Sequence, residues 1–398
     1  MKKHLMTSAA LAIAASAASA GGVDRSGQGV GVIFSETGAS GGYAQFSFGN
    51  VNPTANGGFT LGGGLLPGEA SPLGNYAQAG FAYKQQLTDA LSLTLIYDQP
   101  FGAQVSYDSG APFFGGFAEI ESDAFTVLGR YELGNGLSVH GGVRALKLEG
   151  EIFTLFDGGA NPALLSAESD FEFGGVLGVA YERPDIALRV ALTYSSAIDV
   201  GFDGTESRLD PAGGPGGVPD PTAAATITAD SAFDVEFPES INLDFQSGVA
   251  EDTLVFGTVR WVGWGGFNLT TDGAGLANLS TGLPGRGDSE YVNFEEDTVT
   301  YTLGVGRRLS DQLSVALSYT YEAEGNKPST TALAPTTGLQ SIGLSGSYAL
   351  DGGVTISGGV TYGIPGDQIV ENSVVDGGEV LFDDNEVIGV GIRVGFAF

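Results

Sequence analysis

The chain ends on Glu386-Val-Ile-Gly-Val-Gly-Ile-Arg-Val-Gly-Phe-Ala-Phe398, and this stretch decides the fold class. Large apolar side chains stand at every second position, while glycine, alanine and Arg393 fill the positions between them. Strict alternation with a period of two predicts a β-strand with one apolar face and one small or polar face. A strand of about ten residues with this pattern is typical of the wall of an outer-membrane β-barrel.

The same alternation recurs along the chain and predicts about fourteen strands. The expected strands are 43–51, 76–87, 91–97, 124–133, 137–148, 171–182, 187–198, 240–249, 253–264, 298–309, 313–322, 340–350, 354–362 and 386–398. The sequence therefore predicts an all-β protein. A soluble all-β sandwich is the alternative to a barrel.

The connections between these strands alternate between short and long. The short ones are 88–89, 134–136, 183–185, 251–252, 310–312 and 351–353, and the long ones include 98–123, 149–170, 199–239, 265–297, 323–339 and 363–385. Alternate connections of an up-and-down barrel lie at the same rim. The rhythm therefore predicts an antiparallel up-and-down transmembrane β-barrel with short periplasmic turns and long extracellular loops.

The first residues have the features of a secretory signal peptide. Residues 1–20 combine a charged start, a short apolar run and an Ala-Ser-Ala cleavage site. We expect cleavage after Ala20 and a barrel domain over residues 43–398, in the outer membrane of a Gram-negative bacterium. The sequence has no cysteine, which excludes disulfides and a lipid-anchored cysteine.

Composition excludes several function classes. A formal charge of −31 argues against nucleic-acid binding, which needs cations to neutralise phosphates. With only His4 and His140 available, a histidine-based metal site is excluded, and a serine-hydrolase triad would depend on His140 alone. Calcium binding by acidic loops such as 383–385 stays open as an alternative. The sequence predicts neither an enzyme nor a cofactor.

The basic residues of the strands are the candidate ligand contacts. If the bulky apolar face of each strand contacts lipid, the basic residues on the other face point into the lumen. These residues are Lys84, Arg130, Arg144, Arg189, Arg260, Arg308 and Arg393, together with His140. Arginine facing lipid near mid-membrane costs about 2–4 kcal/mol, so the lumen is the expected place. Arg189 and Arg260 are the main candidates for an anionic head group, followed by Arg144, Arg393 and His140. The alternative is a lumen held together by arginine–carboxylate pairs.

Several motifs resemble one known family. Residues 173–196 read FGGVLGVAYERPDIALRVALTYSS, and residues 237–267 read FPESINLDFQSGVAEDTLVFGTVRWVGWGGF. Together with NFEED at 293–297 and YTLG at 301–304, they resemble the FadL family of outer-membrane long-chain fatty acid transporters. This resemblance covers most of residues 76–398 in order.

The resemblance implies a fourteen-stranded barrel with an N-terminal hatch in the lumen. The hatch would be residues 21–42, which lack the family's Asn-Pro-Ala signature, with Val30, Val32, Ile33 and Phe34 as lumen contacts. The family releases its ligand sideways at a kinked strand. Pro100 and Gly102 are the expected kink, because proline cannot donate to the ladder. The alternative is that they begin an outer loop.

Residues and resemblance together predict a passive outer-membrane channel for long-chain fatty acids or similar hydrophobic molecules. The expected partners are that ligand, the membrane lipid and the barrel assembly machinery, since Phe398 resembles the assembly signal of such barrels. The alternatives are an uptake channel for aromatic hydrocarbons, a water-filled porin, and a structural or adhesive barrel.

Overall fold

A closed β-barrel is the architecture of the molecule. The computed structural model describes residues 23–25, 29–61, 64–108, 113, 115–156, 161–209, 225–271, 289–325, 329, 331–371 and 378–398. Over these residues, fourteen antiparallel strands pair in a ring, as the sequence predicts. The expected signal peptide lies outside the described residues. No helix of the described part is long and apolar enough to cross a membrane.

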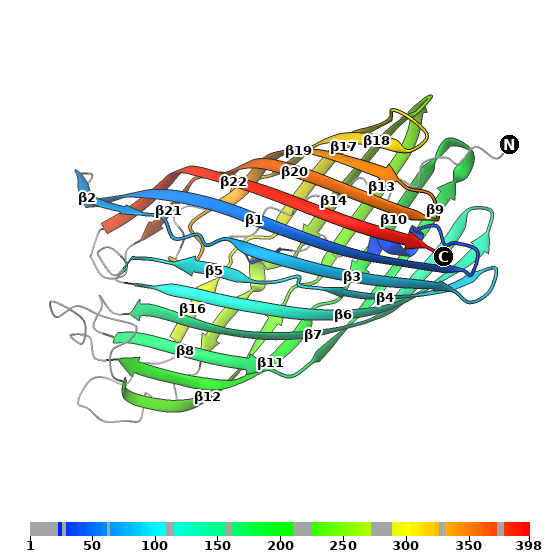
Figure 1. Ribbon diagram of the computed structural model, residues 1–398. Coiled ribbons are helices and arrows are strands. Elements are labelled where there is room, and N and C mark those ends of the chain that lie inside the picture. The colour runs from blue at the N-terminus through cyan, green and yellow to red at the C-terminus, as the bar shows by residue number, and fades with distance from the viewer. Residues whose placement is uncertain are drawn as a thin grey trace.

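The wall strands follow chain order around the ring (Figure 1). They are β1 (Gly42–Leu61), β3 (Tyr76–Gln86), β4 (Leu91–Asp98), β6 (Phe117–Gly134), β7 (Leu137–Phe156), β9 (Glu172–Arg183), β10 (Leu188–Ser195), β13 (Ser240–Ala250), β14 (Thr253–Val262), β17 (Thr298–Arg308), β18 (Leu313–Glu322), β19 (Thr337–Ala349), β20 (Val354–Gly366) and β22 (Gly378–Ala397). Every expected strand overlaps one of these, although several, such as β1 and β22, extend beyond the expected bounds.

Eight further strands were not expected from the sequence and lie among the long connections. They are β2 (Gly64–Ala70), β5 (Ala103–Ser106), β8 (Asn161–Ser169), β11 (Ile198–Leu209), β12 (Ala225–Phe237), β15 (Asn268–Thr271), β16 (Ser289–Asn293) and β21 (Gln368–Glu371). Most of them continue wall strands beyond the membrane, where β7, β8, β11 and β12 form an outer extension of the sheet. There the polar loop composition hides the alternation that marks a strand.

The short turns lie together at the rim of the barrel opposite to the outer extension. Asn135, Ala187 and Asp252 have positive φ angles in three of these turns, as tight hairpins require. The long connections all leave the other rim, at the left of Figure 1. Because outer-membrane barrels have short periplasmic turns, we expect the short-turn rim to be the periplasmic one and the extension to face outward.

The first and last strands close the ring. β1 pairs with β22 from Tyr43↔Ala397 to Leu61↔Gly378. Phe398 adds three bonds at this rim, since its N–H donates to Gly42 O and its carbonyl accepts from Gly42 N, each at 3.0 Å, and from Ser40 N at 3.1 Å. The terminal alternation therefore forms the strand that completes the barrel.

The outer surface of the wall is apolar and carries tyrosines near the extracellular rim. Tyr97, Tyr194 and Tyr362 lie on three different wall strands, with Tyr194 and Tyr362 exposed and Tyr97 half-buried. Each donates its hydroxyl to a carboxylate just outside, on Asp123, Glu239 and Glu386 respectively. An aromatic ring with a polar tip suits the membrane–water boundary, so these tyrosines mark the outer interface.

Candidate functional site

The third wall strand is interrupted around Pro100 and Gly102, whose role as a kink for sideways release stays a prediction. β3 pairs with β4 only as far as Phe81↔Tyr97. The next bridge between these two neighbouring segments is Leu73↔Val105. β4 stops at Asp98 and β5 resumes at Ala103. Over the residues between them, the ladder with β3 is missing.

Residues 23–25 of the N-terminal segment (residues 23–25 and 29–42) occupy this break. Asp24 forms a bridge with Phe101, Arg25 N donates to Pro100 O at 2.9 Å, and Gly102 N donates to Val23 O at 3.0 Å. Gly102 permits this approach, because a Cβ there would lie 2.6 Å from Arg25 Nη1 and 2.9 Å from Ile120 O. The break in the wall is therefore filled by backbone from inside.

Side chains reinforce the docked residues. Gln78 Nε2 donates to Arg25 O at 2.9 Å, and the Arg25 guanidinium lies over the Tyr76 ring at 3.9 Å from its centroid. Burial lowers the pKa of Arg25 from its ordinary value. The Asp24 carboxylate, 2% exposed, accepts a hydrogen bond from Arg260 Nη2 at 2.6 Å. Arg260, a main candidate for a ligand head group, is thus bound to the N-terminal segment.

The 3₁₀-helix η3 (Val30–Phe34) packs on the inner face of the wall. Val32 and Ile33 are buried in a cluster with Ala82, Ile96, Leu128 and Val176, and Val30 and Phe34 pack against it. These four residues thus lie against the inner face of the wall. Their predicted role as lumen contacts for a ligand stays a prediction, as does their role in a hatch.

Phe34 brings together two more predicted residues. The Arg189 guanidinium lies over its ring at 4.6 Å from the centroid, with Arg130 at 5.0 Å. His140 meets the ring edge-on at 6.1 Å and its Nε2 is 2.9 Å from Thr193 Oγ1. Arg189 and His140 therefore both contact the Phe34 ring of the N-terminal segment. Arg393 lies apart from them on β22, opposite Ser47 and Ser357.

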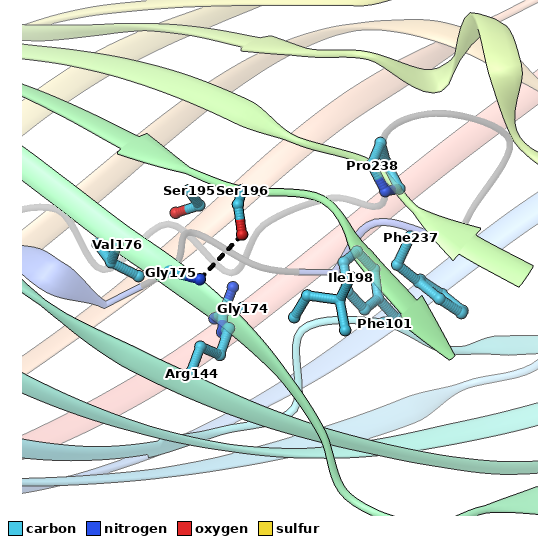
Figure 2. Close-up of a pocket in the computed structure, with 10 residues that line it drawn as sticks. All are labelled: Phe101, Arg144, Gly174, Gly175, Val176, Ser195, Ser196, Ile198, Phe237 and Pro238. Atoms are coloured by element: carbon cyan, nitrogen blue, oxygen red, sulfur yellow. Dashed lines mark hydrogen bonds between the residues drawn. The ribbon is translucent and has the colours of Figure 1, made fainter. Parts of the chain in front are cut away.

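A narrow pocket lies beside the third-strand break (Figure 2). It is lined by Phe101, Arg144, Gly174, Gly175, Val176, Ser195, Ser196, Ile198, Phe237 and Pro238. A second pocket near η3 shares Arg144, Val176 and Ser195 with it, so the two adjoin. Each has a cavity volume of about 10 Å³, room for about one water molecule. In this closed form, a ligand can enter only by moving side chains.

Arg144 is the charged residue of this pocket. Its Nη2 binds Asp98 Oδ2 at 3.1 Å, and its Nε is buried with no hydrogen-bond partner among the described residues. A guanidinium that keeps a donor unused beside an apolar cavity can bind one more acceptor. Among the predicted cations, Arg144 is therefore the one that lines the cavity.

An aromatic cluster extends the pocket outward. Phe101 packs against Phe237 with 4.9 Å between centroids and the rings tilted by 44°, and it contacts Trp264 edge-to-face at 6.0 Å. Phe267 and Phe294 continue the cluster. The sequence analysis did not predict these contacts, although Phe237 and Phe267 are the first and last residues of one of the motifs quoted there. The described residues contain no group of three or more His, Asp or Glu side chains that could hold a metal ion.

Comparison with known proteins identifies the family. Residues 66–397 match the model of the outer membrane protein transport protein family (OMPP1/FadL/TodX). The chain belongs to this family. The OMPP1/FadL/TodX proteins are outer-membrane transporters of hydrophobic compounds, not enzymes, and the barrel lies in the outer membrane of a Gram-negative bacterium. Among curated proteins, none matches the sequence.

Solved structures of the FadL/TodX type share the fold. A Pseudomonas aeruginosa FadL homologue is 14% identical, with a TM-score of 0.72 over 92% of this chain and 94% of that one. The Pseudomonas putida toluene transporter TodX is 15% identical, with a TM-score of 0.65 over 92% of both chains. The CymD monoaromatic hydrocarbon channel is 13% identical, with a TM-score of 0.59 over 90% and 89%. At such identities the likeness shows the fold alone.

Proposed function

We propose that the protein takes up hydrophobic molecules by passive diffusion and delivers them sideways into the membrane. One observation carries this proposal: the ladder of the third wall strand is interrupted beside an apolar pocket, and residues 23–25 fill the break. Intact barrel walls offer no sideways path, because every strand is hydrogen-bonded to both neighbours. Displacing the N-terminal segment would open one.

The finer proposal concerns the substrate, for which we infer a long-chain fatty acid. The pocket is mostly apolar with a single cation, as suits an amphiphile with one carboxylate. Arg144 replaces Arg189 and Arg260 as the residue to bind that carboxylate, since it lines the pocket and keeps its Nε unused among the described residues.

An aromatic hydrocarbon is the second candidate. Phe101, Phe237 and Trp264 offer ring faces and edges, and an uncharged ligand needs no cation. The Arg144–Asp98 pair then has only a structural role. The water-filled porin and the adhesive barrel have no comparable support in the lumen.

The test compares two labelled substrates in cells that lack other uptake channels. The wild type should take up both oleate and toluene, or one of them, faster than channel-free cells. The double variant Arg144→Gln/Asp98→Asn removes both charges together, so it leaves no buried unpaired charge. Oleate uptake should fall about tenfold, the loss of one charged hydrogen bond, while toluene uptake stays unchanged. Equal oleate uptake would contradict the fatty acid proposal, and no uptake of either would contradict the transport proposal.

A further inference from the structure

Arg144 and two aromatic rings line the same pocket. Figure 2 shows the Arg144 side chain at one end of the labelled group and Phe101 and Phe237 at the other. A fatty acid would engage the cation with its carboxylate but meet the rings only with its alkyl chain. An aromatic hydrocarbon would meet the rings and leave the cation unused. A ligand that matches both ends carries a carboxylate and an aromatic ring in one molecule.

The cation end has an unused donor. Arg144 is 6% exposed, and its Nη2 donates to Asp98 Oδ2 at 3.1 Å. Its Nε is buried and has no hydrogen-bond partner among the residues that the structure describes. A guanidinium carries donors on all three nitrogens, so Arg144 can bind the carboxylate of a ligand and keep its bond to Asp98.

The ring end presents aromatic faces and edges. Phe101 and Phe237 are buried against each other, and Phe267 meets Phe237 at a steep angle of 72° with 5.4 Å between centroids. Tilted and T-shaped ring pairs are favourable because ring edges carry positive and ring faces negative partial charge. A ligand ring that joins this cluster gains such contacts, whereas a saturated ring of similar size does not.

One aliphatic side chain separates the two ends. Ile198 belongs to the same apolar cluster as Phe101 and Phe237. It also covers Gly174, where a Cβ would lie 2.6 Å from Ile198 Cγ1. Gly174 and Gly175 add no side chain to this part of the pocket. A rotamer change of Ile198 would therefore join the cation end to the ring end.

We propose that the pocket binds aromatic carboxylic acids in which a short alkyl chain joins the ring to the carboxylate. The carboxylate binds Arg144, and the ring packs against Phe101 and Phe237. The alkyl chain must be short because both ends belong to one pocket. This inference rests on the proposed uptake of hydrophobic molecules and adds a ligand class to it.

Equilibrium binding to the detergent-solubilised protein tests the ring end. The probe is radiolabelled phenylbutanoate, and its matched control is cyclohexylbutanoate, which carries the same carboxylate on a saturated ring. Phenylbutanoate should bind about fivefold more tightly, as expected for one favourable set of ring contacts. Equal affinities, or no saturable binding of phenylbutanoate, would overturn the proposal.

An uncharged analogue tests the cation end. Phenylbutanamide should bind at least tenfold more weakly than phenylbutanoate, because it loses a hydrogen bond between two charged groups. In Arg144→Gln/Asp98→Asn this difference should disappear, while the preference for phenylbutanoate over cyclohexylbutanoate remains. If the amide difference persists in the double variant, Arg144 does not bind the carboxylate and the proposal fails.

A second double variant assigns the ring contacts. Phe101→Leu/Phe237→Leu keeps the site apolar and should abolish the preference for phenylbutanoate while cyclohexylbutanoate binds within about twofold of wild type. Equal weakening of both acids would show a structural role only and contradict the proposal. The matched control is Phe202→Leu/Phe233→Leu, which alters a stacked pair that does not line the pocket. The preference should survive there, and its loss would also count against the ring contacts.

Uptake by cells keeps this inference separate from the proposed function. Wild-type uptake of oleate or toluene, combined with no preference for phenylbutanoate in the binding experiment, overturns the aromatic acid proposal and leaves the transport function standing. A wild type that takes up neither oleate nor toluene contradicts the transport function itself.

Discussion

Arg260 on β14 binds Asp24 inside the barrel, with 2.6 Å between Nη2 and Oδ2, although 236 residues separate the two along the chain. The pair holds residues 23–25 against the third-strand break. Removing one partner of such a buried pair costs about 3–5 kcal/mol, because the other charge is left without compensation.

Asp24→Asn should therefore release the N-terminal segment. We expect a higher steady ion conductance in planar bilayers and faster proteolysis near the N-terminus, with the barrel still folded by its mobility on unheated gels. Asp24→Asn/Arg260→Gln should recover part of the loss, since neither charge remains. Asp185→Asn, which alters an exposed pair in a periplasmic turn, is the control and should change nothing. Unchanged conductance in Asp24→Asn would show that the pair does not hold the segment.

Gly102→Val should displace the same segment by sterics. A side chain at Gly102 meets the backbone oxygen of Ile120, which cannot move aside cheaply, as well as the Arg25 guanidinium. We expect conductance to rise as in Asp24→Asn. Gly266→Val is a suitable control, because a Cβ at that position meets nothing within 4 Å. If both variants behave like the wild type, the close approach of Arg25 has no part in closing the wall.

Phe398→Ala should slow assembly more than it destabilises the finished barrel. The backbone bonds to Gly42 remain in this variant, and the Phe398 ring is 48% exposed. The amount of protein in the outer membrane should fall severalfold in growing cells, while the midpoint of denaturant unfolding changes little. Deleting Phe398 removes the backbone bonds as well and should lower both. Equal amounts of Phe398→Ala and wild type would argue against recognition of Phe398 by the assembly machinery.

Glu206 fastens the β15–β16 hairpin to the outer extension. Its carboxylate, 2% exposed, accepts hydrogen bonds from Thr271 Oγ1 and Tyr291 Oη, each at 2.9 Å. Glu206→Leu leaves both hydroxyls without their acceptor, at about 1–3 kcal/mol for each that stays buried. Added protease should cut the extracellular loops of intact cells faster. Tyr291→Phe removes only one donor and should show a smaller change.

The sequence predicted the membrane part of the wall well, because lipid on one side imposes an unbroken alternation. Residues 313–322 were expected as a strand, and β18 has these bounds. The outer extension was missed, since its strands, such as β11 and β12, bury only their inner face, and their outer face meets water instead of lipid and so lacks the bulky apolar side chains that mark a wall strand. β22 begins at Gly378, earlier than the alternation at 386–398 suggests, for the same reason.

The candidate site was predictable by residue type but not by pairing. Alternation placed Arg144 and Arg260 in the lumen, where both are buried. Their partners Asp98 and Asp24 come from the end of another strand and from the N-terminal segment. No local pattern relates residues so far apart.

The pairing of β1 with β22 has a consequence for biosynthesis. The strand that leaves the ribosome first must wait for the strand that leaves last, so the ring cannot close on a nascent chain. Loop closure over such a sequence separation is slow, and unpaired strand edges stay open to aggregation meanwhile. Both ends also meet at the short-turn rim. Joining them and cutting the chain at another periplasmic turn would therefore keep every ladder while changing which two strands must find each other last.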